Sequence, residues 1–140
     1  MPSVFSRIIA GELAGYFVWR DARCVALLSN RPLRPGHTLV VPRLEVDHWI
    51  DLDADLLAHL VATAQAIGRG QMAGFKPARI GLMLAGLEVP HVHFHVVPIR
   101  GVYDLDFGNQ DPNPDASMMA QAAETLRAEL RRLGYTQVAG

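Results

Sequence analysis

Polar and apolar residues alternate strictly at 91–96 within the segment 91–98, and its three polar positions are all histidine: His91, His93 and His95. Because successive side chains of a β-strand point to opposite faces, this pattern predicts a strand with three imidazoles on one face. Residues two apart on a strand are separated by about 6.6 Å. Neighbouring imidazoles at that spacing can reach different oxygens of one phosphate, or one metal ion.

Four further apolar runs predict buried strands, because they are rich in β-branched and aromatic residues and are bounded by turn residues. These runs cover residues 16–19, 24–28, 38–41 and 78–84. Together with the histidine segment they give five expected strands.

Three segments carry helix signals. A short helix is expected between Ser3 as N-cap and Gly11, a long one from Asp51 or Asp53 to about Met72 with Gly74 as its end, and a third over about 115–133. The last two helices show apolar stripes at helical spacing, which predict faces packed against the core. The stripes consist of Leu56, Leu57, Leu60, Val61, Ala64 and Ile67, and of Met118, Ala122, Leu126 and Leu130. Segment 101–114 is rich in Gly, Pro, Asn and Asp and predicts a loop.

The length of 140 residues suits one domain over 1–140, with a core at about 3–100 and a C-terminal extension at 101–140. The net charge of −1 argues against a general nucleic-acid binder or a membrane-surface binder, since both rely on a basic excess. No apolar run reaches the roughly 18 residues of a membrane span, and no signal peptide is evident. The single cysteine, Cys24, lies in an apolar run, so we expect a buried inert thiol and a cytoplasmic protein.

A lone histidine is usually a surface residue or a hydrogen-bonded core residue, and we expect His48 and His59 at the surface. Three histidines in register differ from this, because burying them costs desolvation and packs poorly. A site that needs a nucleophile, a proton donor and a phosphate ligand can use all three. The row at 91–95 therefore predicts a functional site.

The pattern His91-x-His93-x-His95-x-x, with an apolar residue at every x, resembles the signature of the histidine triad (HIT) family of nucleotide hydrolases and transferases. Residues 34–42, RPGHTLVVP, resemble the family's "APGHxLVIP" segment at the expected distance upstream. The resemblance implies an α+β fold, with a five-stranded antiparallel sheet, one long helix, and short N-terminal and C-terminal helices. It also implies a homodimer.

The same resemblance assigns roles to the histidines. His93 would be the nucleophile that attacks the α-phosphorus of a nucleotide ester, anhydride or phosphoramidate, giving a nucleotidyl-histidine that water hydrolyses to a nucleoside monophosphate. His95 would bind a phosphate oxygen and serve as proton donor. His91 and His37 would orient the nucleophile and set its tautomer. This scheme requires no cofactor.

The expected ligand is a purine nucleotide or a nucleotide conjugate, with nucleotide contacts from Ser29, Asn30, Glu88 and Val89. Ser29 stands where the family has an aspartate that contacts the ribose. Leu87 replaces the family's glutamine, and Glu88 replaces a hydroxyl residue that often donates to the phosphate. An ionised Glu88 would repel a nearby phosphate, so it has to point away, be protonated, or act on a different leaving group.

Many HIT proteins hold a structural zinc with two cysteines near the N-terminus and a histidine after the "VIP" element. Here the corresponding residues are Ser3, Ser6 and Glu45. Hydroxyl oxygens are poor zinc ligands, so the sequence predicts no structural zinc.

Three alternatives to a phosphoramidase-like hydrolase stay open. The first is a nucleotide-binding regulatory protein with weak or lost catalysis, favoured by Ser29, Leu87 and Glu88. The second is a diadenosine polyphosphate hydrolase. The third is a metal site built from the three alternating histidines.

Overall fold

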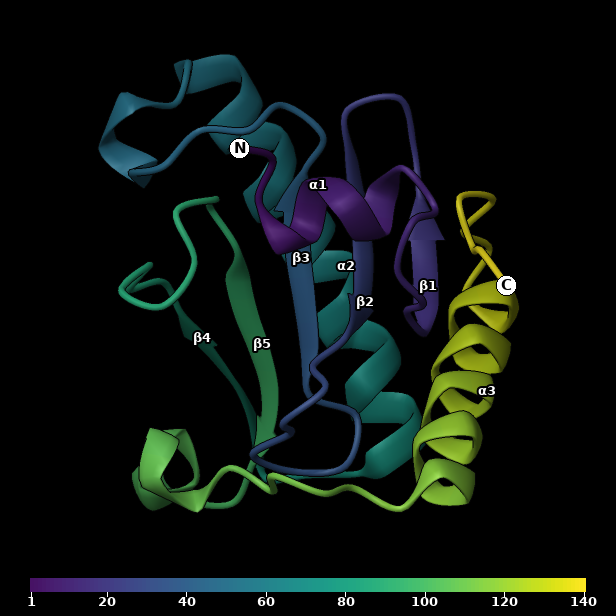
Figure 1. Cartoon of the computed structure of the whole chain (residues 1–140). Coiled ribbons are helices and arrows are strands. Elements are labelled where there is room, and N and C mark those ends of the chain that lie inside the picture. Colours follow the sequence, from purple (N-terminus) through teal and green to yellow (C-terminus); the bar gives the residue numbers. More distant parts are fainter.

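The five strands form one antiparallel sheet in the computed structural model, which describes residues 1–140 (Figure 1). They are β1 (Phe17–Arg20), β2 (Cys24–Leu28), β3 (Thr38–Pro42), β4 (Arg79–Met83) and β5 (Phe94–Ile99), and they lie side by side in the order β1-β2-β3-β5-β4. β2 pairs with β3 along its whole length, and β5 lies between β3 and β4. The predicted α+β class with five antiparallel strands is confirmed.

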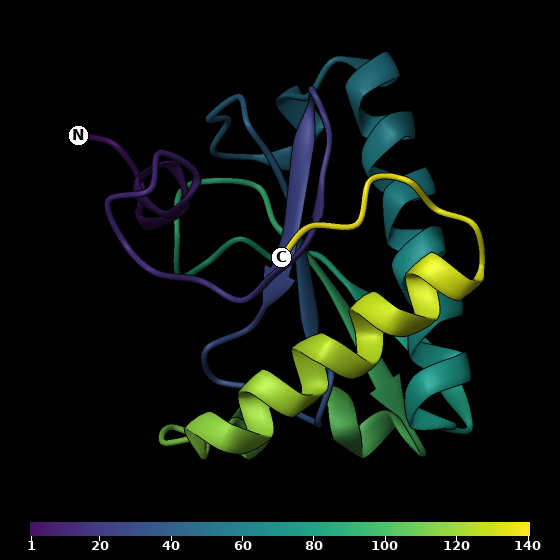
Figure 2. The ribbon, with the colours of Figure 1, turned by 90° about the vertical axis from the view of Figure 1, so that its right-hand side faces the viewer.

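The two faces of the sheet are covered unequally, as Figure 2 shows edge-on. The long helix α2 (Ala54–Phe75) and the C-terminal helix α3 (Ala116–Arg132) pack on one face, above the larger core. The short helix α1 (Val4–Ile9) lies on the other face, where a smaller apolar cluster contains Phe5, Leu27 and Leu39. The side of α1 is therefore where the fold leaves room for a cavity.

α2 follows the short 3-10 turn η1 (Trp49–Asp51) and begins after Asp53, one of the two expected caps. It continues past Gly74 to Phe75 and ends at Lys76, which adopts the left-handed conformation at φ 51°. The prediction that Gly74 ends the helix was wrong. A Cβ at Gly74 would lie 2.9 Å from Cγ2 of Thr125, so this glycine instead permits the close approach of α3. None of the helices is long and apolar enough to span a membrane.

Most of the predicted stripe residues are buried, including Leu56, Leu60 and Ile67 of α2 and Leu126 and Leu130 of α3. Two expected members are exposed, Val61 at 44% and Met118 at 62%. Met119 is buried in place of Met118, whereas Ala122, Leu126 and Leu130 are buried as expected. A strict spacing of four residues drifts away from the helical period of 3.6, so the buried residue at the start of α3 is the one three positions before Ala122.

Replacing Leu126 with alanine should lower the free energy of unfolding by about 2–5 kcal/mol, because its side chain is fully buried between α2 and the sheet. Met118→Ala on the same helix removes an exposed side chain, so its effect should stay within about 0.5 kcal/mol. Urea denaturation of both variants measures the difference. Equal effects would contradict the packing described for α3.

The C-terminal segments hold structure that the sequence did not predict. Within 101–114 the chain forms two short 3-10 helices, η2 (Val102–Leu105) and η3 (Phe107–Asn109), rather than only a loop. α3 begins at Asp115, whose carboxylate accepts hydrogen bonds from the backbone N–H of Ser117 and Met118. After Gly134 the tail runs along β1, where Ala139 N–H donates to the Val18 carbonyl at 3.2 Å.

Candidate functional site

The histidine row starts before the strand that was expected to carry all of it. β5 begins at Phe94, so only His95 lies in the strand, while His91 and His93 lie in the segment that leads into it. His93 and His95 still share one face, since their ring centroids are 4.9 Å apart, and Phe5 of α1 packs on His93 on the face opposite α2 and α3. The ring of His37, which precedes β3, lies 5.2 Å from that of His95. The fold brings the four histidines together, each at most 6% exposed.

Both ring nitrogens of His91 are engaged by the protein. Nε2 lies 2.7 Å from the carbonyl oxygen of Pro42, and a carbonyl only accepts, so Nε2 carries the hydrogen. Nδ1 lies 2.6 Å from the Ser3 hydroxyl, which therefore donates to it. His91 joins α1 to the end of β3 and offers no nitrogen to a ligand.

The hydrogen bond of His93 sets its tautomer. Nδ1 lies 2.7 Å from the carbonyl oxygen of His91, so Nδ1 donates and the lone pair is on Nε2. Nε2 makes no hydrogen bond within the protein. Burial lowers the pKa of His93, which favours the neutral ring with this free lone pair.

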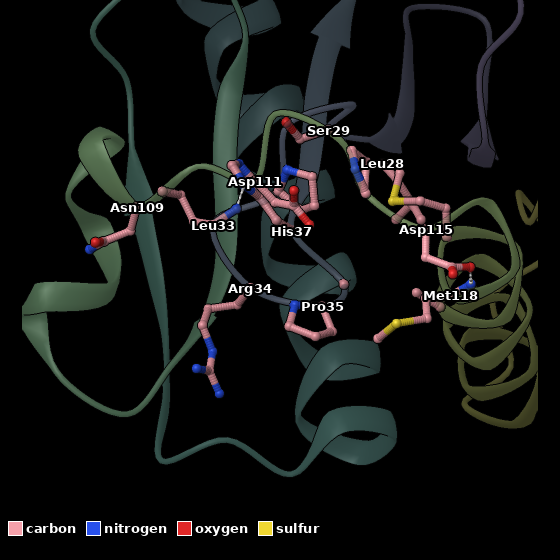
Figure 3. A pocket seen from close by; sticks show the side chains of 15 residues that line it. Leu28, Ser29, Leu33, Arg34, Pro35, His37, Asn109, Asp111, Asp115 and Met118 are labelled. Carbon is pink, nitrogen blue, oxygen red and sulfur yellow. Dashed lines mark hydrogen bonds between the residues drawn. The ribbon is translucent and has the colours of Figure 1, made fainter.

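A chain of two hydrogen bonds sets the tautomer of His95. The backbone N–H of Leu33 donates to Nδ1 of His37 at 3.0 Å, drawn as a dashed line in Figure 3, so the hydrogen of His37 is on Nε2. That Nε2 donates to Nδ1 of His95 at 2.9 Å, which places the His95 hydrogen on its own Nε2. Burial lowers the pKa of His37 to about 3 and that of His95 to about 4, and repulsion from neighbouring histidines adds to both shifts. Near pH 7, His95 is therefore a neutral ring with a free N–H donor.

A cavity of about 640 Å³ opens in front of His93 and His95, within the size range of small-molecule sites. All four residues expected to contact a nucleotide line it: Ser29, Asn30, Glu88 and Val89. Its apolar wall comes from α1, the segment before β1, the sheet and the start of α3, and includes Phe5, Ile8, Tyr16, Leu27, Leu39 and Met119. His37 and His91 lie behind the two histidines that face the cavity.

A second, smaller cavity of about 200 Å³ lies on the other side of segment 29–37. Figure 3 shows the side chains that line it. It lies between that segment and the start of α3, and its lining includes Arg34, Asp111 and Met118. His37 closes one side of it, but neither His93 nor His95 reaches it. The larger cavity is therefore the candidate active site.

A family model described as "HIT domain" matches residues 10–102, a range that contains all four histidines. The chain belongs to the HIT family. An uncharacterised HIT-like protein of Mycobacterium tuberculosis is 37% identical over 127 residues, 84% of this chain and 88% of the relative. A bifunctional bis(5'-adenosyl)-triphosphatase/adenylylsulfatase of Arabidopsis thaliana is 38% identical over 96 residues, 65% of this chain and 52% of the relative.

Among solved structures, a zinc-bound histidine triad family protein from Mycobacterium smegmatis superimposes with a TM-score of 0.81 at 28% identity. The match covers 93% of this chain and 94% of that protein. The family resemblance predicted from the two motifs is thereby confirmed, and the chain has the fold of the nucleotide-binding HIT hydrolases and transferases.

The family's zinc position, as the sequence resemblance places it, is filled by hydrogen bonds in this HIT protein. Glu45 Oε1 accepts from the Ser6 hydroxyl at 2.6 Å and from the Ser3 backbone N–H at 2.7 Å. The remaining member, His91, has both nitrogens engaged. Two hydroxyls, one carboxylate and an occupied imidazole do not fit zinc, which prefers thiolate and imidazole ligands.

Three residues that support the site in this HIT protein were missed by the sequence reasoning. The ring of Phe5 packs on His93 at 4.9 Å, and that of Phe107 meets the edge of His95 at 5.1 Å. The buried side-chain amide of Gln71 donates to the carbonyls of Gly36 and Val96, which ties α2 to the segments before β3 and within β5. Gln71 gave a usable signal as a polar residue within an apolar helix, whereas Phe107 lies in a segment that predicted only a loop.

Proposed function

We propose that this chain is a nucleotide hydrolase of the phosphoramidase type, which acts at the α-phosphate through a nucleotidyl-His93 intermediate and releases a nucleoside monophosphate. The observation that carries the proposal is the free lone pair on His93 Nε2, next to the His95 N–H and at the wall of the large cavity. A nucleophile and a phosphate-oxygen donor adjoin one another in a space that accepts a nucleotide.

In the first step, His93 Nε2 donates its lone pair to the α-phosphorus, and the bond from phosphorus to the leaving group breaks. The leaving group departs with the bonding electrons and takes up a proton from solvent. His93 becomes positively charged, and the hydrogen bond from its Nδ1 to the His91 carbonyl stabilises that charge. The Nε2 hydrogen of His95 stabilises the negative charge on a phosphate oxygen.

In the second step, a water molecule attacks the same phosphorus and the bond to His93 Nε2 breaks. The electron pair returns to Nε2, the water's proton passes to solvent, and a nucleoside monophosphate leaves. Imidazole suits both steps, because it is nucleophilic as a neutral ring near pH 7 and departs readily from phosphorus.

The hydrogen bonds of the ring nitrogens argue against a metal site in the histidine row. Of the three alternating histidines, only His93 and His95 keep a nitrogen free, since Ser3 and Pro42 occupy those of His91. Two imidazoles fall short of the three protein ligands found in catalytic zinc sites.

An assay of AMP release from adenosine 5'-phosphoramidate and from diadenosine triphosphate tests the proposed reaction. We expect turnover of the phosphoramidate with the larger kcat/KM. Tight AMP binding without any turnover would overturn the proposal in favour of a nucleotide-binding regulatory protein. Faster turnover of diadenosine triphosphate would favour a diadenosine polyphosphate hydrolase, the activity named for the Arabidopsis relative.

Glu88 supports the preference for an uncharged or cationic leaving group. Its exposed side chain lines the cavity beside His93, and its negative charge acts on that ring. A polyphosphate leaving group would bring several negative charges to this side of the cavity, and each would be repelled.

Glu88→Gln should therefore raise kcat/KM for diadenosine triphosphate roughly 3- to 10-fold relative to that for the phosphoramidate, since one solvated charge at a few Å is worth about 1 kcal/mol. Steady-state assays of both substrates give this ratio. Asp53→Asn removes a charge outside the cavity and should leave the ratio unchanged. An unchanged ratio in Glu88→Gln would show that Glu88 does not select the leaving group.

We also propose that the protein is a homodimer paired through β4. This strand pairs with β5 on one side only, and its other edge is open. Three apolar side chains flank that edge with exposed fractions of 42–50%: Val61, Met72 and Leu82. An open strand edge beside an apolar patch is suited to a second copy of the same strand.

Leu82→Glu should convert the dimer to a monomer, because it places a charge at the centre of that patch. Light scattering after size-exclusion chromatography measures the mass. Met118→Glu changes an exposed apolar residue on α3, away from β4, and should leave the dimer intact. A wild-type monomer, or a Leu82→Glu dimer, would contradict this interface.

A further inference from the structure

Three side chains with metal-binding atoms meet on the face of the sheet opposite the histidine row. They are Asp21 in the turn between β1 and β2, Cys24 at the start of β2, and His59 on α2. One donor atom from each lies within 4.8 Å of the other two. Cys24 belongs to the larger core beneath the helices, so the group is separated from the large cavity by the sheet. It plays no part in the proposed reaction.

The donors are the kinds that zinc prefers: a thiol sulfur, an imidazole nitrogen and a carboxylate oxygen. Zinc bond lengths of about 2.3 Å to sulfur and 2.0–2.2 Å to nitrogen and oxygen place tetrahedral ligands roughly 3.3–3.6 Å apart. Cys24 Sγ lies 3.5 Å from Asp21 Oδ2, which matches. His59 Nε2 lies 2.8 Å from the same oxygen, so the ring must retreat by about 0.5 Å to fit such a tetrahedron.

Hydrogen bonds hold the Asp21 carboxylate and burial holds Cys24, whereas His59 is free to adjust. Oδ1 of Asp21 accepts from the backbone N–H of Arg23 and of Cys24, both at 2.8 Å, and Trp19 Nε1 donates to Oδ2 at 3.0 Å. Such outer hydrogen bonds orient metal ligands in proteins. The side chain of His59 is 33% exposed, which gives it room to move and opens a path from solvent.

The fourth position is open to water. A water molecule can enter from the exposed side of His59. It completes the four-coordinate geometry that zinc adopts with three protein ligands.

We propose that Asp21, Cys24 and His59 form a zinc site that joins the β1–β2 turn to α2. On binding, the Cys24 thiol releases its proton to solvent. The hydrogen that His59 Nε2 donates to Asp21 moves through solvent to Nδ1, so the ring keeps one hydrogen and Nε2 is free to bind the ion. The sulfur, nitrogen and oxygen lone pairs bind the metal. This inference departs from the expectation of a protein without metal, which considered only the N-terminal position and the histidine row. It also departs from the expected surface position of His59, which is half-buried.

Cobalt titration of the reduced full-length protein tests the site, because Cys24 is the only cysteine of the chain. We expect a sulfur-to-cobalt charge-transfer band that saturates at one equivalent of Co²⁺ and disappears when Zn²⁺ is added. The histidine row contains no sulfur, so cobalt bound there gives no such band. Bound cobalt without the band, or no binding at all, would overturn the proposal.

Variants identify the other ligands. His59→Ala and Asp21→Asn should each weaken cobalt binding at least about tenfold, and Cys24→Ser should abolish the band. His48→Ala removes an exposed histidine outside the group and should retain both band and affinity. If both His59→Ala and Asp21→Asn kept the band and bound cobalt with unchanged affinity, Cys24 would bind the metal without them, and the proposed site would also be overturned.

Discussion

His93→Ala should lower kcat/KM for AMP release from a phosphoramidate by at least roughly 10⁴-fold, a loss of about 5.4 kcal/mol of transition-state stabilisation. The reason lies in the hydrogen bonds of the four rings. His91 has no free nitrogen, and His95 presents a hydrogen rather than a lone pair, so only His93 Nε2 can attack phosphorus. Without it, the cavity can bind a nucleotide but has no nucleophile.

Single-turnover assays measure this loss, and circular dichroism with thermal unfolding shows whether the variant folds. His48→Ala replaces an exposed histidine and should leave the rate unchanged. His93→Gly provides a second check, because added imidazole should restore part of its activity by occupying the vacated space. A His93→Ala protein that keeps a tenth of the wild-type rate would contradict the assigned nucleophile.

Lowering the pH from 7 to 5 should reduce the free energy of unfolding by several kcal/mol. Burial is the largest cause of the lowered pKa of His37, His91, His93 and His95, with values of about 3 for His37 and about 4 for His95. The unfolded chain takes up these protons at its ordinary pKa of about 6.5, whereas the folded chain does not. The free energy of unfolding is therefore fully retained above pH 6.5, and it decreases as the pH falls toward the pKa values of the histidines in the folded chain.

Below pH 6.5, each histidine with a strongly lowered pKa reduces the free energy of unfolding by about 1.4 kcal/mol per pH unit. His37 and His95 together should therefore lower the free energy of unfolding by about 4 kcal/mol between pH 7 and pH 5. Urea denaturation at pH 7, 6 and 5 measures the slope. His37→Gln removes one buried titrating ring and should flatten the slope, whereas His48→Gln, at an exposed position, should not. A stability that does not change between pH 7 and 5 would contradict the burial of the neutral histidines.

The local pattern of the chain was sufficient to predict the five strands and the sidedness of the histidine row, whereas their arrangement in one antiparallel sheet came from the resemblance to the HIT family. Alternation at 91–96 depends only on strand geometry, and the structure places Phe94 and Val96 in the core beneath the helices as expected. Helix ends and the first turn of the α3 stripe were less predictable. Gly74 was expected to end α2 but lies where α3 approaches it, and Met119 rather than Met118 is buried at the start of α3. Both details depend on how the two helices pack.

The four histidines of the candidate site were predictable from their spacing and the two motifs, but their hydrogen-bond directions were not. The tautomer of His93 depends on the His91 carbonyl, and that of His95 depends on the Leu33 N–H four residues before His37. These backbone groups have no signature in the sequence. The Asp21, Cys24 and His59 group was also hidden, because His59 lies 35 positions beyond Cys24 and meets it only through packing of α2 on the sheet.

The most direct test of the central claim is the mass of the protein when it is quenched during turnover of an adenosine phosphoramidate. The account predicts an increase by one adenylyl group, carried by the peptide that contains His93 and absent from His93→Ala. An unmodified protein during rapid turnover, or an adenylyl group on any other residue, would contradict it.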